Sequence, residues 1–211
     1  MFCNKDNINW DDLDGLREIV KSFVKEKRYV HTLGVEEEAV KLAGIFEITD
    51  AKLIKKIKAS AILHDITKEF DMKKQVEISA KYNFELNYDD IKSEKPVHSK
   101  TAAYIAKYEF YADDIIFNAI YNHTLGGPVD SFIADKIIYL ADYIEINRTY
   151  GDCVEVREYF YSGIKNAETL GEKYKILDET ILFSCNKTIE ALIEENLFIH
   201  KDTVKHRNSF I

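Results

Sequence analysis

Apolar residues recur at spacings of three and four over most of the chain, which is the periodicity of helices that bury one face. Only two prolines and eight glycines interrupt the 211 residues, so long helices can form without a break. The pattern predicts an all-α fold, a compact helical bundle. The expected helices cover residues 11–28, 32–47, 50–65, 72–83, 97–108, 112–123, 130–146, 153–165 and 169–197.

Several positions mark where the expected helices begin and end. Asp50 has the side chain of a helix N-cap, and Pro96 stands where the first turn of a helix tolerates proline. The sequence of residues 126–128, Gly-Gly-Pro, forces a loop soon after His123. We expect a single domain over residues 1–211, with a core at about 17–199 and a polar, peripheral tail from His200.

Three apolar helical faces end in residues that bind metals. These are His64 and Asp65 after the stripe in residues 54–61, His123 after the stripe in 116–120, and Asp142 after the stripe in 134–141. Side chains three and four apart share a helix face, so we expect these residues to be buried. A buried carboxylate needs a counter-charge, and no Lys or Arg lies beside Asp65 or Asp142 on these faces in the local sequence. A bound cation is therefore expected.

His31 and His98 complete a set of six candidate ligands. Imidazoles and carboxylates without thiolate suit iron, manganese, zinc or magnesium, and the set exceeds what one tetrahedral catalytic zinc requires. Two metals shared by one carboxylate, about 3.5–4 Å apart, would hold a hydroxide for phosphoryl displacement, and Asp65 is the best candidate for the bridge. The set indicates a metal-dependent hydrolase. His200 and His206 are expected to be ordinary surface or core histidines.

Composition narrows the function further. The formal net charge of -8 argues against a general nucleic-acid-binding surface, although it is compatible with a local basic pocket for a phosphate. Cys3, Cys153 and Cys185 are an odd number at irregular spacing, which predicts neither a disulfide framework nor a cysteine zinc site. No apolar run suits a signal peptide or a membrane span. We expect a cytoplasmic protein without a membrane partner, with a homodimer as one option for its assembly.

The order His31, His64-Asp65, Asp142 resembles the signature of HD-domain phosphohydrolases. Further segments are similar to the YqeK-type family within that superfamily, and the match extends from about residue 17 to the tail at Arg207-Asn208. Family members usually have proline where this chain has Ile146 and a methionine in the loop 127–130, and neither position is a proposed ligand. The similar segments run from Arg28 to Val35, Ile62 to Glu69, Val97 to Ser99, Ala119 to Gly126 and Asp135 to Glu145.

The resemblance implies a dinuclear hydrolase that cleaves diadenosine tetraphosphate symmetrically into two ADP, with iron as the expected metal. Carried over position by position, one metal would be held by His31, His64, Asp65 and Asp142, and the second by Asp65, His98 and His123. Asp65 and Lys68 are then the residues expected to take part in catalysis.

Arg28 and Lys68 are the first candidates for binding substrate phosphates. Arg28 precedes His31 by three residues and Lys68 follows Asp65 by three, so each could lean over the metals. For Lys68 the alternative is an exposed ion pair with Asp65 or Asp71.

Four residues near the other ligands are weaker candidates. Thr124 and the amides of Gly126 and Gly127 could bind a phosphate, and a plain glycine turn explains them nearly as well. Arg148 could bind substrate or, together with Glu145, orient Asp142. Surface ion pairing is an equal alternative for both.

Other functions share the same metal site. The closest enzymatic alternatives are another HD nucleotidase and a pyrophosphohydrolase of a guanosine alarmone. The non-enzymatic alternative is a nucleotide-sensing HD protein, and the intact ligand set argues against it because a binding module need not retain an activated water.

Overall fold

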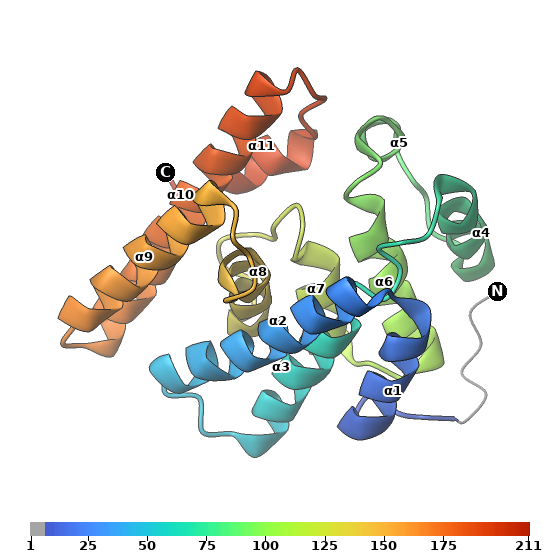
Figure 1. Ribbon diagram of the computed structural model, residues 1–211, viewed down its shortest axis with the longest axis horizontal. Coiled ribbons are helices and arrows are strands. Elements are labelled where there is room, and N and C mark those ends of the chain that lie inside the picture. Colours follow the sequence, from blue (N-terminus) through green and yellow to red (C-terminus); the bar gives the residue numbers. More distant parts are fainter. Residues whose placement is uncertain (1–6) are drawn as a thin grey trace.

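The computed structural model describes residues 7–211, so Cys3 lies outside the described part. Within that part the chain forms eleven α-helices and no strand, which confirms the all-α prediction (Figure 1). The helices are α1 (Leu13–Phe23), α2 (Glu26–Ile45), α3 (Ala51–Leu63), α4 (Met72–Tyr82), α5 (Tyr88–Ser93), α6 (Val97–Glu109), α7 (Asp114–Asn122), α8 (Ile133–Ile144), α9 (Gly151–Asn166), α10 (Leu170–Glu194) and α11 (Lys201–Asn208).

Side-chain caps explain where many of these helices begin. Asp50 accepts a hydrogen bond from the amide of Lys52, as its position in the sequence predicts. Asp71 and Asp113 cap α4 and α7 in the same way, and Thr169 begins α10 with a capping box. Such caps satisfy amides that have no partner inside the helix, and each contributes about 1 kcal/mol.

The first two helices differ from the sequence prediction. The break falls at Val24 and Lys25, whose backbones are extended, and not after residue 28. The side chain of Glu69, distant in sequence, accepts a hydrogen bond from the amide of Lys25 (3.0 Å) and so fixes the start of α2. A tertiary contact thus decides the boundary, and it places Arg28 on the same helix as His31, about one turn away.

Two short helices were not predicted. Helix α5 begins with a capping box between Asn87 and Asp90. The tail beyond His200 is polar in sequence but not peripheral, because it forms α11 and buries His200, Thr203 and His206. Apolar periodicity cannot detect such a helix, since its buried face is made of polar side chains.

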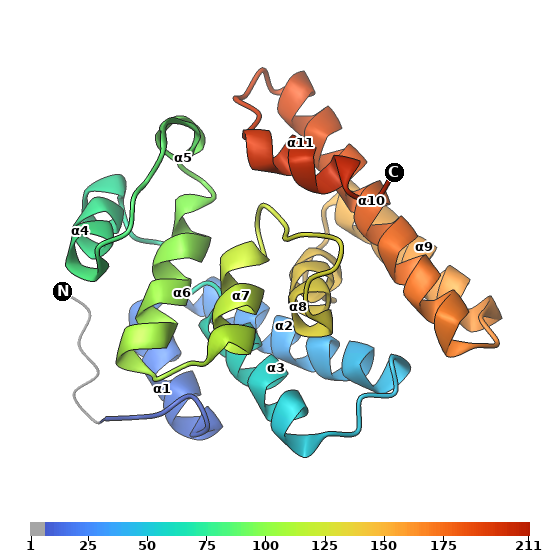
Figure 2. The ribbon, with the colours of Figure 1, turned by 180° about the vertical axis from the view of Figure 1, so that it is seen from behind.

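Four helices form the centre of the molecule, and the other helices lie on either side of them. Helices α2, α3, α7 and α8 pack against one another in the middle of the molecule. Helices α9 and α10 form a pair on one side with α11 packed on α10, and α1, α4, α5 and α6 lie on the other side (Figure 2). The ends of α3, α7 and α8 therefore meet in the interior, near the beginning of α6.

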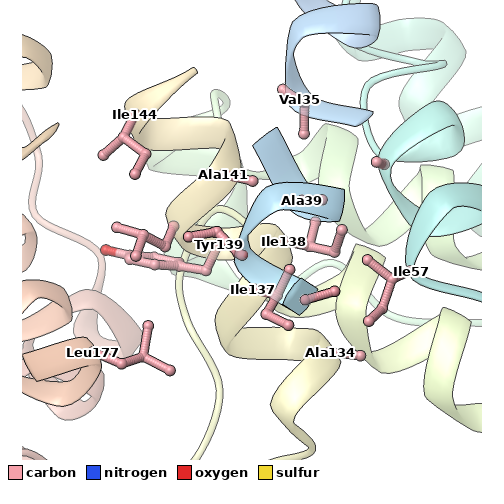
Figure 3. Close-up of a cluster of buried hydrophobic side chains, with 14 of the residues drawn as sticks. Val35, Ala39, Ile57, Ala134, Ile137, Ile138, Tyr139, Ala141, Ile144 and Leu177 are labelled. Carbon is pink, nitrogen blue, oxygen red and sulfur yellow. The ribbon is translucent and has the colours of Figure 1, made fainter. Parts of the chain in front are cut away.

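Helix α8 shows how the core fixes this arrangement. Most of its side chains are buried, and small residues such as Ala134 and Ala141 let α2 and α3 approach closely (Figure 3). Ile137 and Ile138 are fully buried in the same cluster, and burial of each such side chain contributes about 1.5–3 kcal/mol. Its last turn presents Asp142 to the centre of the molecule.

Cys153 and Cys185 are buried free thiols.

Among the helices of residues 7–211, none combines the length and the apolar character that crossing a bilayer requires.

Candidate metal centre

The six predicted ligands come together from five helices. His31 lies in the second turn of α2, His98 in the first turn of α6, and Asp142 in the last turn of α8. His64 and His123 are the C-cap residues of α3 and α7, and Asp65 follows His64 in a turn. Helix ends suit this arrangement because a C-cap side chain can leave the helix direction and still bond to its last turn.

Burial agrees with the sequence prediction. His64 is fully buried, and Asp65, His98 and His123 are each 2% exposed. The side chain of Asp142 is 17% exposed, so the centre opens to solvent on the Asp142 side. The apolar stripes therefore carry these polar residues inward.

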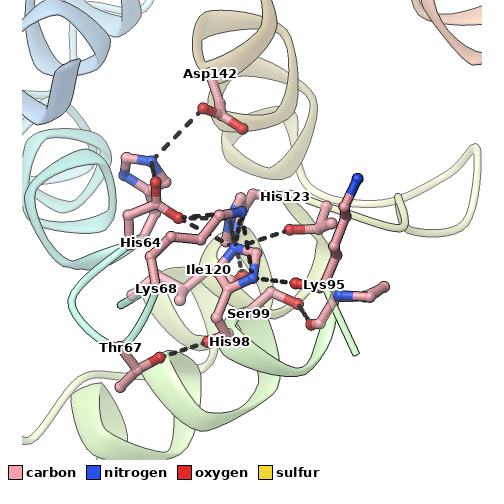
Figure 4. A network of polar contacts seen from close by, with 12 residues as sticks. His64, Thr67, Lys68, Lys95, His98, Ser99, Ile120, His123 and Asp142 are labelled. Atoms are coloured by element: carbon pink, nitrogen blue, oxygen red, sulfur yellow. Dashed lines mark hydrogen bonds and ion pairs between the residues drawn. The ribbon is translucent and has the colours of Figure 1, made fainter. Parts of the chain in front are cut away.

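Each histidine uses its Nδ1 atom in a bond to the protein. The Nδ1 atoms of His64 and His123 donate to the carbonyls of Ala61 and Ile120, three residues earlier (both 2.6 Å). His98 Nδ1 donates in the same way to the carbonyl of Lys95 (Figure 4). In the neutral imidazole these bonds place the single proton on Nδ1 and leave Nε2 with a lone pair for a cation.

His31 is held by a carboxylate. Its Nδ1 atom lies 3.0 Å from Oε1 of Glu145, which is 1% exposed. Burial pushes the pKa of Glu145 upward, but hydrogen bonds from His31 and the Asn147 amide bring it below its ordinary value. The carboxylate is thus charged and fixes His31 with its Nε2 atom toward the other ligands.

The two oxygens of Asp65 face different pairs of histidines. Oδ2 lies 3.6 Å from His31 Nε2 and 3.4 Å from His64 Nε2. Oδ1 lies 3.1 Å from His98 Nε2 and 3.6 Å from His123 Nε2. This is the position expected of a carboxylate shared between two ions.

Asp142 belongs to the first of these groups. Its Oδ1 atom lies 2.9 Å from His31 Nε2. The same atom lies 3.7 Å from His64 Nε2, a contact that Figure 4 marks. On the other side, the Nε2 atoms of His98 and His123 are 3.0 Å apart. The contacts of the two Asp65 oxygens therefore divide the four histidines into two pairs.

The donor atoms fit metal ions. Within residues 7–211, the Nε2 atoms of His31 and His64 and Oδ1 of Asp65 are buried without a hydrogen bond of normal geometry. Lone pairs that face one another across about 3 Å repel unless a cation lies between them. Three groups of these side chains have ligand atoms within 4.8 Å of one another: His31, His64 and Asp65; His64, His123 and Asp142; and Asp65, His98 and His123.

The two halves of the centre differ electrostatically. Burial lowers the pKa of His64, but Asp65 and Asp142 outweigh it and raise the pKa to about 9. Burial and the Lys68 ammonium lower the pKa of His98 to about 3, and burial also lowers that of His123. The first half therefore attracts positive charge, and the second holds neutral imidazoles, the form that binds metal ions.

In the folded chain, basic side chains reach both aspartates. Arg28 Nη1 lies 2.7 Å from Asp65 Oδ2, and Arg148 donates from Nη2 to Asp142. Lys68 Nζ lies 3.9 Å from Asp65 Oδ1 and 3.1 Å from His98 Nε2. Lys68 and Arg148 are near their aspartates in the sequence, whereas Arg28 comes from α2 and is distant from Asp65 along the chain.

Glu145 also differs from its expected role, since it orients His31 and not Asp142. Gly34 makes this contact possible, because a Cβ atom there would lie 2.2 Å from Glu145 Oε2. Thr67 was missed by sequence reasoning: its hydroxyl donates to the carbonyl of His98 (2.9 Å) and supports the start of α6. A lone buried threonine gives no signal in a sequence.

The loop after α7 is divided between two roles. The Thr124 hydroxyl lies 3.2 Å from His98 Nε2 and faces the centre. Gly126 has a φ of +80° and donates its amide to Asn122, and a Cβ atom there would overlap His206. The carbonyl of Gly127 accepts from His206. These contacts favour the glycine-turn alternative for Gly126.

His200 and His206 lie outside the centre. His200 is 3.3 Å from Asp90, and His206 packs on the loop and bonds to Gly127 (2.6 Å). Both are core histidines, as the sequence prediction allows.

Comparison with known proteins identifies the family. The HD domain model matches residues 28–147. "Bis(5'-nucleosyl)-tetraphosphatase, symmetrical" of Bacillus subtilis (strain 168) is 32% identical over 185 residues, 87% of this chain and 89% of the relative. The protein of that name from Halalkalibacterium halodurans is 30% identical over 197 residues, 92% of this chain and 94% of the relative.

A solved structure shows the same fold. The crystal structure of a predicted HD superfamily hydrolase involved in NAD metabolism from Clostridium acetobutylicum matches with a TM-score of 0.80 at 30% identity. The match covers 93% of this chain and 95% of that chain. The chain therefore belongs to the HD-domain family, in the group that includes these bacterial symmetrical tetraphosphatases.

Proposed function

We propose that the protein hydrolyses dinucleoside tetraphosphates and cleaves diadenosine tetraphosphate symmetrically into two ADP. The observation that carries the proposal is the convergence of four Nε2 atoms on two carboxylates, with the oxygens of Asp65 directed to different histidine pairs. The names of the relatives from two bacteria support the choice of substrate.

We further propose two divalent ions. His31, His64, Asp65 and Asp142 would hold one, and Asp65, His98 and His123 the other. Such ligands suit iron, our first choice, and also manganese, zinc or magnesium. When bound, the ions supply an activated water and stabilise negative charge on the phosphates.

The basic residues around the opening would bind the substrate. Arg28, Lys68 and Arg148 have partly exposed side chains that reach Asp65 or Asp142. Once cations neutralise the aspartates, these side chains can turn to the substrate phosphates, where the planar guanidinium groups can bind two oxygens at once. Lys68 lies against His98 and so is placed to neutralise the phosphate that is attacked. Because the substrate is a nucleotide, we assign the protein to the cytoplasm.

A nucleotide panel tests the proposal. Metal-loaded protein is incubated with diadenosine tetraphosphate, a guanosine tetraphosphate alarmone and nucleoside monophosphates, and the products are separated by chromatography. ADP as the sole product of the dinucleotide, at a rate well above the others, is expected. ATP plus AMP would show that the cleavage is asymmetric. Faster hydrolysis of the alarmone would show that the alarmone, and not the dinucleotide, is the substrate.

A further inference from the structure

A second cavity lies beside the metal centre, between the α5–α6 junction and the turn from α10 to α11. Its volume is about 180 Å³, and its wall includes Lys92, Lys95, Leu125, Leu192 and Phe198. Figures 1 and 2 show α5 and α11 on either side of this region. No residue of the proposed metal ligand set lines it.

The cavity and the centre share structural elements. Thr124 lines the cavity, and its hydroxyl lies 3.2 Å from His98 Nε2. Lys95 also lines the cavity, and its carbonyl accepts the hydrogen bond from His98 Nδ1 (Figure 4). A molecule in the cavity would therefore lie next to the His98 half of the metal centre.

The lining has the polarity of a nucleotide site. Leu125, Leu192 and Phe198 provide an apolar surface. Phe198 is 41% exposed and meets the Tyr88 ring in an edge arrangement, with 6.3 Å between the ring centroids, so part of its surface is open to an apolar ligand. Lys92 and Lys95 are exposed cations on the same wall. A nucleoside diphosphate has a flat apolar base at one end and negative phosphates at the other, and this lining offers a partner for each.

A buried ionic cluster holds the walls in place. Asp90 of α5 is fully buried and lies 2.6 Å from Lys100 Nζ on α6 and 3.3 Å from His200 at the start of α11. Lys100 and His200 are 5% and 2% exposed. The cluster ties α5 to α6 and to the start of α11 without including a proposed metal ligand, so this part of the wall is held in place.

We propose that this cavity binds one nucleoside of the dinucleoside polyphosphate, with its base against Leu192 and Phe198. The inference rests on the proposed function for the identity of the ligand. The volume is below the roughly 300–1,000 Å³ of pockets that enclose drug-sized ligands, so the cavity takes one nucleoside and leaves the other outside. The phosphate chain would extend past Lys95 and Thr124 toward the centre.

A larger cavity of about 430 Å³ lies across Leu125, lined by Gly126, Gly127 and residues of α11. Within residues 7–211, none of its lining side chains has a hydrogen bond or ion pair to the six proposed ligands. The smaller cavity is therefore the better candidate for the nucleoside site.

The test compares a ligand that has a base with one that lacks it. Phe198→Ala removes the stacking surface, and Leu192→Trp fills the cavity. Ile193→Trp is the matched control, because Ile193 is 63% exposed and does not line the cavity. Binding of ADP and of inorganic pyrophosphate to the metal-loaded proteins is measured by titration calorimetry.

Both variants are expected to weaken ADP binding about tenfold, within the range of base–aromatic stacking. Pyrophosphate binding should stay within about twofold, since both ligands carry a diphosphate and only ADP has a base. The control should bind both ligands as the parent does. Unchanged ADP binding in both variants, or equal loss for ADP and pyrophosphate in Phe198→Ala, would overturn the proposal.

Failure of the proposed function gives a different result. In that case the parent protein would not convert diadenosine tetraphosphate to ADP, yet the two variants would still lose ADP binding selectively. Turnover and binding therefore test the two proposals separately.

Discussion

Replacement of Glu145 by glutamine tests whether the protein orients its ligands through contacts behind them. The carboxylate accepts from His31 Nδ1 through Oε1 (3.0 Å) and from the Asn147 amide through Oε2 (2.7 Å). A glutamine has the same shape but only one accepting oxygen. Whichever way its amide turns, its NH₂ group faces a donor, and the negative charge beside His31 is lost.

The magnitude follows from the bond that is lost. A hydrogen bond to a charged group contributes about 1.5–3 kcal/mol, and each 1.4 kcal/mol is about a factor of ten in affinity. Glu145→Gln should therefore lower the affinity for the ion at the His31 half by roughly 10–150-fold. Contacts behind a metal ligand typically contribute about 10–100-fold to metal affinity, which agrees with this range. The ion at His98 and His123 should be affected little, because Glu145 does not touch them.

The assay is metal retention during titration with a chelator, followed by elemental analysis. We expect one ion to leave Glu145→Gln at a lower chelator concentration than it leaves the parent. Glu38→Gln is the matched control, since Glu38 is also a buried carboxylate of this fold, but its partner is the Tyr161 hydroxyl. Parent-like retention by Glu145→Gln, or an equal change in both variants, would refute the reasoning.

Three further predictions follow from the site and its surroundings. Asp65→Ala should remove both ions in elemental analysis, because its oxygens face both histidine pairs, and loss of only one would make Asp65 a terminal ligand. Arg28→Ala and Lys68→Ala should keep the metal content but lower kcat/KM by roughly 10–1,000-fold, the loss of one or two charge-assisted contacts; parent-like rates would make them ordinary surface cations. Asp135→Asn should raise the free energy of unfolding at pH 7 by about 1–3 kcal/mol, measured by denaturant unfolding. Burial raises the pKa of Asp135 from 3.8 to about 6. The parent therefore loses stability as the pH rises from about 4 to about 6, because a buried carboxylate becomes charged. If Asp135→Asn were equally more stable than the parent at pH 4, the charge of Asp135 would not be the cause.

Much of the centre could be predicted because its ligands continue apolar helical faces. His64, His123 and Asp142 stand where a buried stripe ends, and burial of such groups in a helical pattern already demands a partner charge. The same periodicity yields most of the helices. Resemblance to HD-domain proteins then assigned His31 to one half of the site and His98 to the other. The contacts of the two Asp65 oxygens agree with this assignment.

The rest depends on contacts between residues distant in sequence. The start of α2 is set by Glu69, the partner of Asp65 is Arg28, and Glu145 contacts His31 across Gly34. The polar helix α11 has no apolar stripe and is held by Asp90 and by the loop at Gly127. None of these pairings leaves a periodic signal, so only the folded chain reveals them.

The most direct test of the metal-centre proposal is product analysis with and without metal. The protein is stripped with a chelator, divided, and one half is reloaded with iron under anaerobic conditions before both receive diadenosine tetraphosphate. Chromatography should show ADP alone, formed only by the reloaded half. Equal ADP formation by the stripped half, or ATP plus AMP from the reloaded half, would contradict the proposal.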